Sequence, residues 1–133
     1  MKVLLDTNRL TDLLRGDPKI VEQVEQAVEV WVPFVTMGEI KAGFLAGNRS
    51  ENNHRLLHQL LHQPGIGVLF ADRETSDYYA RLFFQLRKAG TPIPTNDLWI
   101  ASLSVQYELT LLSRDEHFDK LPQLLRGYLG VVC

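Results

Sequence analysis

Short apolar runs alternate with longer stretches of helical periodicity from one end of this chain to the other. The pattern predicts strands near residues 2–5, 30–35, 67–70, 109–112 and 128–132, and helices near residues 7–15, 18–28, 36–47, 51–62, 72–89 and 95–107. Strands that alternate with helices are typical of an α/β protein, and right-handed crossovers between parallel strands place helices on both faces of the sheet. We therefore predict an α/β fold with a central, mostly parallel five-stranded sheet, formed by residues 1–133 as a single domain.

Four acidic residues lie where an apolar run gives way to a polar turn or a helix start: Asp6, Glu39, Asp97 and Asp115. The carboxyl ends of parallel strands face a shared crevice, so these side chains are expected to meet there. Carboxylates brought together repel one another and lose water, and they stay ionised together only beside a cation. Hard divalent cations prefer carboxylate oxygen and water as ligands. The spacing therefore predicts a Mg²⁺ or Mn²⁺ site.

Each acid also has a purely structural interpretation. Asp6 is placed to cap the first helix, and Asp97 is a first-turn acid that the helix dipole favours. Glu39 shares an apolar stripe with Ile40 and Phe44, where burial of a lone carboxylate would be costly. The set of four acids, rather than any single member, carries the prediction of a site.

Composition changes this picture little. At 133 residues, 45% of them apolar and 23% charged, the chain is typical of a soluble globular protein. Its apolar runs are shorter than the ~20 residues of a membrane helix. The first apolar run is short and is followed at once by Asp6, which argues against a signal peptide. Cys133 is the only cysteine, so no intrachain disulfide can form, which agrees with a reducing compartment. We expect a cytoplasmic protein without a membrane partner.

The formal net charge of −2 argues at first against a nucleic-acid partner. If four acids hold metal, however, the other twelve of the sixteen acidic residues face fourteen lysines and arginines. The surface outside the site would then carry a charge of about +2, which permits a polyanionic substrate without requiring one. The basic residues are spread along the chain rather than clustered: Lys41, Arg49, Arg87, Lys88, Arg114 and Lys120.

The chain carries four segments in this order: Leu5-Asp6-Thr7-Asn8, Thr36-Met37-Gly38-Glu39-Ile40, Ile93-Pro94-Thr95-Asn96-Asp97-Leu98-Trp99-Ile100-Ala101 and Ser113-Arg114-Asp115-Glu116-His117-Phe118. These segments resemble the motifs of PIN-domain nucleases and, more narrowly, those of the VapC-type toxins of bacterial toxin–antitoxin pairs. The third segment is the most specific of the four, whereas Asp-Thr-Asn alone would be a weak signal. The resemblance covers essentially the whole chain.

The resemblance implies a PIN-like fold and a Mg²⁺- or Mn²⁺-dependent endoribonuclease that acts as the toxin of a type II toxin–antitoxin system. Asp6, Glu39, Asp97 and Asp115 would be its catalytic and metal-binding acids. A divalent cation activates water, so no side-chain nucleophile is required, and in-line hydrolysis leaves 5′-phosphate and 3′-hydroxyl ends. The resemblance also implies an RNA substrate, commonly tRNA, a homodimer and a cognate antitoxin. The alternative is a catalytically silent PIN module that binds RNA or a protein partner.

Supporting residues are assigned by their positions in these motifs. Asn8 and Ser113 stand where the family orients acids or holds water, although each could equally satisfy the local backbone. Arg9 and Arg114 are candidate substrate contacts, and Arg9 could instead counter the charge of the acids. Many relatives carry another acid at the position of His117, so we expect one metal rather than two.

Two apolar features have alternative interpretations. Leu10, Leu13 and Leu14 would either line a groove for the antitoxin or belong to the core. Trp99 is predicted to pack in the core rather than to stack on a base.

Three histidines, His54, His58 and His62, recur every four residues and would form one stripe on a helix, a spacing that can bind zinc. The leucines of the same segment mark a different face of the helix as the buried one. We therefore predict that the stripe is a solvated surface.

Overall fold

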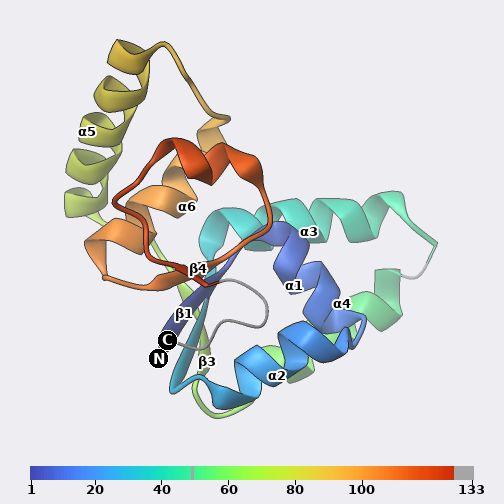
Figure 1. The fold of residues 1–133 in the computed structure, drawn as a ribbon. Helices are drawn as coiled ribbons and strands as arrows, with labels where there is room; N and C mark the ends of the chain where they lie inside the picture. Colours follow the sequence, from blue (N-terminus) through green and yellow to red (C-terminus); the bar gives the residue numbers. More distant parts are fainter. Residues whose placement is uncertain (49, 128–133) are drawn as a thin grey trace.

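The sheet of this protein has five strands in the described part of the chain, and all of their pairings are parallel. The computed structural model describes residues 1–48 and 50–127. The strands are β1 (Lys2–Leu5), β2 (Glu29–Pro33), β3 (Ile66–Leu69), β4 (Thr110–Leu112) and β5 (Arg126–Gly127). Their order across the sheet is β3-β2-β1-β4-β5, which places β1 at the centre (Figure 1). The predicted α/β fold with a five-stranded parallel sheet is confirmed.

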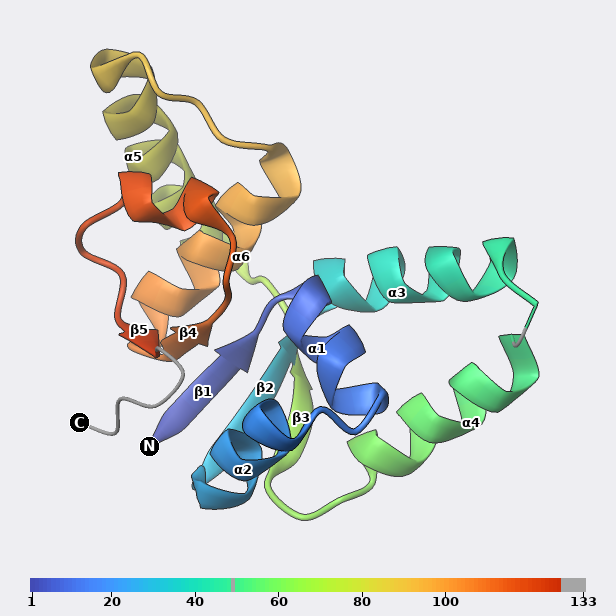
Figure 2. The same cartoon turned by 45° about the vertical axis from the view of Figure 1, so that its right-hand side comes forward.

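The helices cover both faces of the sheet, as predicted. They are α1 (Thr7–Leu14), α2 (Pro18–Gln26), α3 (Phe34–Ala46), α4 (Ser50–Leu61), α5 (Arg73–Ala89) and α6 (Thr95–Gln106), followed by the 3₁₀ helix η1 (Glu116–Lys120). The first four helices lie on one side, and α5, α6 and η1 lie on the other (Figure 2). Each face has its own buried apolar cluster. No helix among the described residues has both the length and the apolar content needed to cross a membrane.

Strand β1 is buried on both faces, and this fixes the position of the residue that follows it. Val3, Leu4 and Leu5 are all 0% exposed. Leu4 packs into the cluster under α5 and α6, whereas Val3 and Leu5 pack into the opposite cluster, as the two-residue period of a strand requires. The chain therefore delivers Asp6 to the carboxyl end of the central strand.

One predicted strand stays untested, and one observed helix lies outside the predicted elements. The strand expected near residues 128–132 lies outside the described residues, and the observed strand β5 ends at Gly127. The 3₁₀ helix η1 was not predicted, because five residues are too few to show a helical period. The remaining boundaries agree within two residues, including that of α3, which begins at Phe34 where the sequence predicts the end of a strand.

Candidate active site

Asp6 stands at the carboxyl end of β1 and begins helix α1. It is the N-cap of the helix, and its Oδ1 accepts the main-chain N–H of Arg9 at 2.9 Å. Its Oδ2 accepts the hydroxyl of Ser113, which follows the neighbouring strand β4. Asp6 is 4% exposed. The capping role considered from the sequence is therefore real, and the same carboxylate also faces the end of a second strand.

Ser113 joins two acids. While its hydroxyl donates to Asp6, its Oγ accepts the main-chain N–H of Asp115 at 3.0 Å. Asp115 in turn caps η1, because its Oδ1 accepts the main-chain N–H of His117 at 2.9 Å. These hydrogen bonds fix the turn after β4 and hold Asp115 beside the end of β1.

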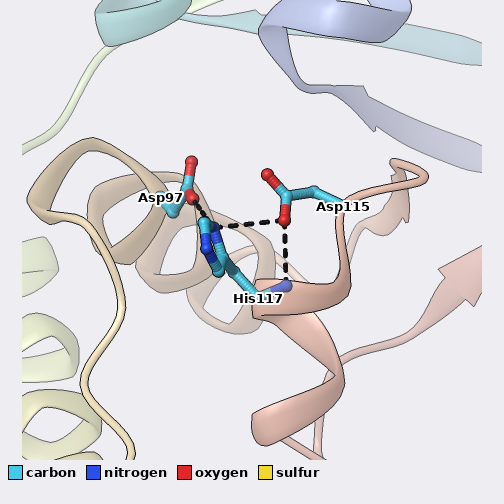
Figure 3. Close-up of side chains that lie close together, drawn as sticks. All are labelled: Asp97, Asp115 and His117. Atoms are coloured by element: carbon cyan, nitrogen blue, oxygen red, sulfur yellow. Dashed lines mark hydrogen bonds and ion pairs between the residues drawn. The ribbon is translucent and has the colours of Figure 1, made fainter.

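The imidazole of His117 lies between two carboxylates (Figure 3). Its Nδ1 is 2.8 Å from Oδ2 of Asp97, in the first turn of α6, and 3.1 Å from Oδ1 of Asp115. The side chains of Asp97 and Asp115 are 20% and 28% exposed, and that of His117 is 42% exposed. From the sequence, His117 marks only the loss of an acid, whereas in the structure its ring contacts two of the predicted site residues.

Glu39 lies on α3, which packs against both α1 and α6. The Oγ1 of Thr7 donates to its Oε1 at 3.0 Å, and Thr7 directly follows Asp6. The expectation that Glu39 is buried in an apolar stripe is wrong, because the residue is exposed. Ile40 and Phe44 turn toward the core, and Glu39 lies on the neighbouring face of the helix. Thr7 was not predicted as part of this arrangement.

Asp6 and Asp97 are costly to ionise without a cation. Burial raises the pKa of Asp6, and the charge of Asp115 raises it further, against the lowering effect of the hydrogen bonds from Ser113 and Arg9. Burial also raises the pKa of Asp97, together with the charge of Asp115 and against the hydrogen bond from His117. Burial of these carboxylates close to the charge of Asp115 therefore favours the binding of positive charge.

The predicted arginines occupy different environments. Arg9 is 6% exposed, and its Nη1 lies 3.2 Å from Oδ2 of Asp12. Arg114 binds the other oxygen of Asp12, also at 3.2 Å, but its side chain is 58% exposed. The charge of Arg9 lowers the pKa of Asp6, which favours the interpretation that it counters the acids over direct contact with substrate. Asn8, the other supporting residue predicted near Asp6, is exposed in the first turn of α1.

A model of the PIN-domain family matches residues 3–124, which is most of the chain. The chain belongs to the PIN-domain family. This PIN domain is 28% identical over 129 residues to Ribonuclease VapC1 of Haemophilus influenzae strain R2866, covering 93% of this chain and 95% of the relative. It is 30% identical over 110 residues to Ribonuclease VapC4 of Mycobacterium tuberculosis, covering 83% and 82% of the two chains.

A solved complex gives the same picture of the fold. The PIN domain superimposes on a chain of VapBC-1 from nontypeable Haemophilus influenzae with a TM-score of 0.84 and 27% identity, covering 96% of this chain and 97% of the other. The predicted family resemblance is therefore confirmed.

The residues present in this PIN domain fit a divalent cation. One ligand atom from each of Asp97, Asp115 and His117 lies within 4.8 Å of the other two. Carboxylate oxygen and imidazole nitrogen are both ligands of divalent metals. The buried carboxylate of Asp6, tied to the same turn by Ser113, adds a further anionic group. This donor set suits a cation better than a neutral ligand.

The histidine stripe lies elsewhere in this PIN domain. His58 is exposed on α4, and His62 is exposed directly after the helix, as predicted. The solvated interpretation is wrong for His54, which is half-buried and packs edge-on against Phe44 at 5.0 Å between ring centroids. Trp99 is half-buried, and its ring lies 4.2 Å from that of Tyr79, in agreement with the predicted packing role.

Proposed function

We propose that this PIN domain is a metal-dependent endoribonuclease that acts as the toxin of a type II toxin–antitoxin pair. The observation that carries the proposal is the chain of contacts that gathers acids from distant segments. Ser113 joins Asp6 to Asp115, and His117 joins Asp115 to Asp97. The similarity to relatives named as VapC ribonucleases supports the same activity here.

Mg²⁺ or Mn²⁺ would be held by Asp6, Asp97 and Asp115, with Glu39 completing the acid set from α3. When bound, the cation supplies a nucleophilic water at neutral pH and offsets the charge that develops on the phosphodiester. The protein's contribution is to keep the carboxylates oriented and to present them at one edge of the sheet. The raised pKa values of Asp6 and Asp97 support a cation as the natural occupant, because an added positive charge would stabilise their ionised forms.

The two hydrogen bonds on Asp6 set its orientation. Its Oδ1 is held by the main-chain N–H of Arg9 and its Oδ2 by Ser113, so each oxygen has a fixed direction. Partners of this kind orient metal-binding carboxylates and contribute to metal affinity. Ser113 therefore acts as a positioning residue, in keeping with the first of the two interpretations made from the sequence.

Arg114 is the better of the two arginines for contact with RNA. Its side chain is 58% exposed and it lies between Ser113 and Asp115 in the sequence. Arginine binds phosphate through paired N–H groups, and one contact to Asp12 limits where the guanidinium can point. Arg9 would act through the shared Asp12 rather than by touching substrate. The proposed substrate of this contact is RNA, which the similarity to VapC ribonucleases supports, with tRNA as the candidate that the family resemblance implies.

A pocket of about 350 Å³ between α1, α3 and α4 is the site that we propose for the antitoxin. Its lining combines apolar side chains with Glu39 and includes Thr7, Leu14, Phe44 and Leu56. Of the three leucines predicted for this role, Leu14 lines the pocket, whereas Leu10 is fully buried in the core. An apolar segment of the antitoxin in this pocket would lie directly beside a site acid.

A homodimer is the predicted assembly, and α5 carries an apolar surface that could serve it. Phe83 and Phe84 are 47% and 65% exposed on this helix. Large exposed aromatic side chains of this kind are common at interfaces between subunits. Sedimentation of the isolated chain would measure the assembly directly.

The experiment that tests the nuclease is cleavage of purified tRNA and total RNA in Mg²⁺ or Mn²⁺ by the wild type and by Asp97→Asn. Cleavage is expected for the wild type, and it should fall to background in Asp97→Asn and on chelation with EDTA. The matched control is Asp77→Asn, which makes the same change on the exposed surface of α5. Circular dichroism establishes that the variants are folded.

Persistent cleavage by folded Asp97→Asn would overturn the assignment of the site. RNA binding without metal-dependent cleavage by the wild type would support the silent PIN module instead. Mapping of RNA 5′ ends after brief induced expression would then identify the substrate and the bond that is cut.

A further inference from the structure

His117 contributes a nitrogen atom to a group of oxygen ligands. Its Nδ1 faces Oδ2 of Asp97 at 2.8 Å and Oδ1 of Asp115 at 3.1 Å, and all three side chains point toward the same space (Figure 3). The donor set at this edge of the sheet is therefore mixed, with imidazole and carboxylate groups side by side.

The separations match those of ligands around one metal ion. Adjacent ligand atoms of a six-coordinate ion with bonds of about 2.1 Å lie about 3 Å apart, and opposite ones lie about 4 Å apart. The two distances from Nδ1 are close to the adjacent spacing, and all three atoms fall within 4.8 Å of one another. A single ion could thus contact all three side chains after small rotations.

The local backbone holds His117 in this position. Its main-chain N–H donates to Oδ1 of Asp115, and the N–H of Asp115 donates to Ser113. The side chain of His117 lies at the start of η1 and is 42% exposed. Hydrogen bonds that fix a ligand in advance are characteristic of metal sites.

We propose that His117 is a metal ligand and that the resulting imidazole–carboxylate site prefers a divalent transition metal to Mg²⁺. The inference rests on the metal site of the proposed function and goes beyond it by naming a nitrogen ligand and a metal preference. Imidazole nitrogen suits divalent transition metals, whereas Mg²⁺ favours oxygen ligands and retains its water. The alternative, in which the ring only donates a hydrogen bond to the two acids, places no nitrogen on the metal.

The test uses Mn²⁺ as a spectroscopic probe of the full chain. Metal-free protein is loaded with one equivalent of Mn²⁺, and pulsed electron paramagnetic resonance is used to detect coupling to a directly bound ¹⁴N nucleus. The dissociation constants for Mn²⁺ and Mg²⁺ are measured by titration and competition in the wild type, in His117→Asp and in the matched control His58→Asp, which makes the same change on the exposed surface of α4.

We expect ¹⁴N coupling in the wild type and in His58→Asp, and its loss in His117→Asp. Removing an indirect partner of a metal ligand alters metal affinity by about 10–100-fold. Removal of the nitrogen ligand itself in His117→Asp should therefore lower the preference for Mn²⁺ over Mg²⁺ by at least about tenfold. Wild-type protein that binds Mn²⁺ without ¹⁴N coupling would overturn the proposal, and so would an unchanged preference in His117→Asp.

RNA cleavage is followed in the same preparations, so that the two proposals can fail separately. Mn²⁺ binding without nitrogen coupling, accompanied by metal-dependent cleavage, would overturn the role of His117 and leave the nuclease intact. Nitrogen coupling without any cleavage would support the ligand and contradict the enzyme.

Discussion

Ser113 donates a hydrogen bond to Asp6 across 107 positions of the sequence. Both residues follow buried strands that pair directly in the sheet, β4 and β1. The contact is buried, and the same serine also accepts the N–H of Asp115. One hydroxyl therefore connects the segments that follow two paired strands of the sheet.

We predict that Ser113→Ala lowers RNA cleavage by about 10–100-fold, the usual effect of removing a group that orients a metal-binding side chain. Ser104→Ala is the matched control, because Ser104 is also buried and donates its hydroxyl to the carbonyl of Leu109 at 2.9 Å. Initial rates should separate the two variants at equal thermal stability. Equal losses in both would show that Ser113 contributes only to folding.

Asp6→Asn is predicted to stabilise the metal-free protein. Asparagine retains the capping acceptor, and it removes the charge whose burial raises the pKa of Asp6. A gain of about 1 kcal/mol would raise the Tm by roughly 3–5 °C for a chain of this size. Asp17→Asn is the control, because Asp17 caps α2 in the same way while only partly buried. Thermal unfolding in EDTA should show a gain for Asp6→Asn alone.

The gain should depend on pH in a defined direction. The pKa of Asp6 in the folded protein lies above its usual value of 3.8, so the folded state keeps a proton that the unfolded chain has already released. The destabilisation is therefore fully present above the raised pKa and disappears as the pH falls through that value. The difference in Tm between Asp6→Asn and wild type should shrink between pH 7 and pH 4. A difference that grows on acidification would contradict the assigned cause.

Asp12→Ala is predicted to destabilise the fold strongly. Asp12 and Arg9 have side chains 9% and 7% exposed, and removing one partner leaves the charge of the other buried, at a cost of about 3–5 kcal/mol. Urea denaturation measures the loss. Lys2→Ala, which breaks the ion pair with Glu29 at a side chain 59% exposed, should cost less than about 1 kcal/mol.

Replacing both partners distinguishes this cause from lost packing. In Arg9→Met combined with Asp12→Leu, no buried charge remains, and most of the stability should return. A double variant as unstable as Asp12→Ala would indicate that shape rather than charge holds this part of α1.

Positions set by strand ends could be predicted from the sequence. Asp6 and Asp115 follow apolar runs long enough to be recognised as strands, and parallel strands bring their carboxyl ends to one edge. Asp97 was found because it opens a helix with a specific motif. In each case a short local pattern determines where the side chain lies.

Features that depend on the rotation of a helix or the shape of a turn could not be predicted. Glu39 is adjacent to the buried Ile40 in the sequence. Which face of α3 is exposed depends on how the helix packs against the rest of the protein. His117 turns toward Asp97 because η1 forms a tight turn after Asp115, and five residues carry no periodic signal. Asp12 was overlooked for a similar reason, since its two arginine partners come from opposite ends of the chain.

The central place of β1 has a consequence for the order in which the protein is made. The chain leaves the ribosome from its amino end, so β1 and Asp6 emerge well before the strand that pairs with the second edge of β1, which begins at Thr110. Closing this long loop is the slowest kind of contact to form during folding. A chain synthesised only as far as α5 therefore carries Asp6 and Glu39 but lacks Asp97 and Asp115, and the four candidate site acids cannot come together before Asp115 has been made.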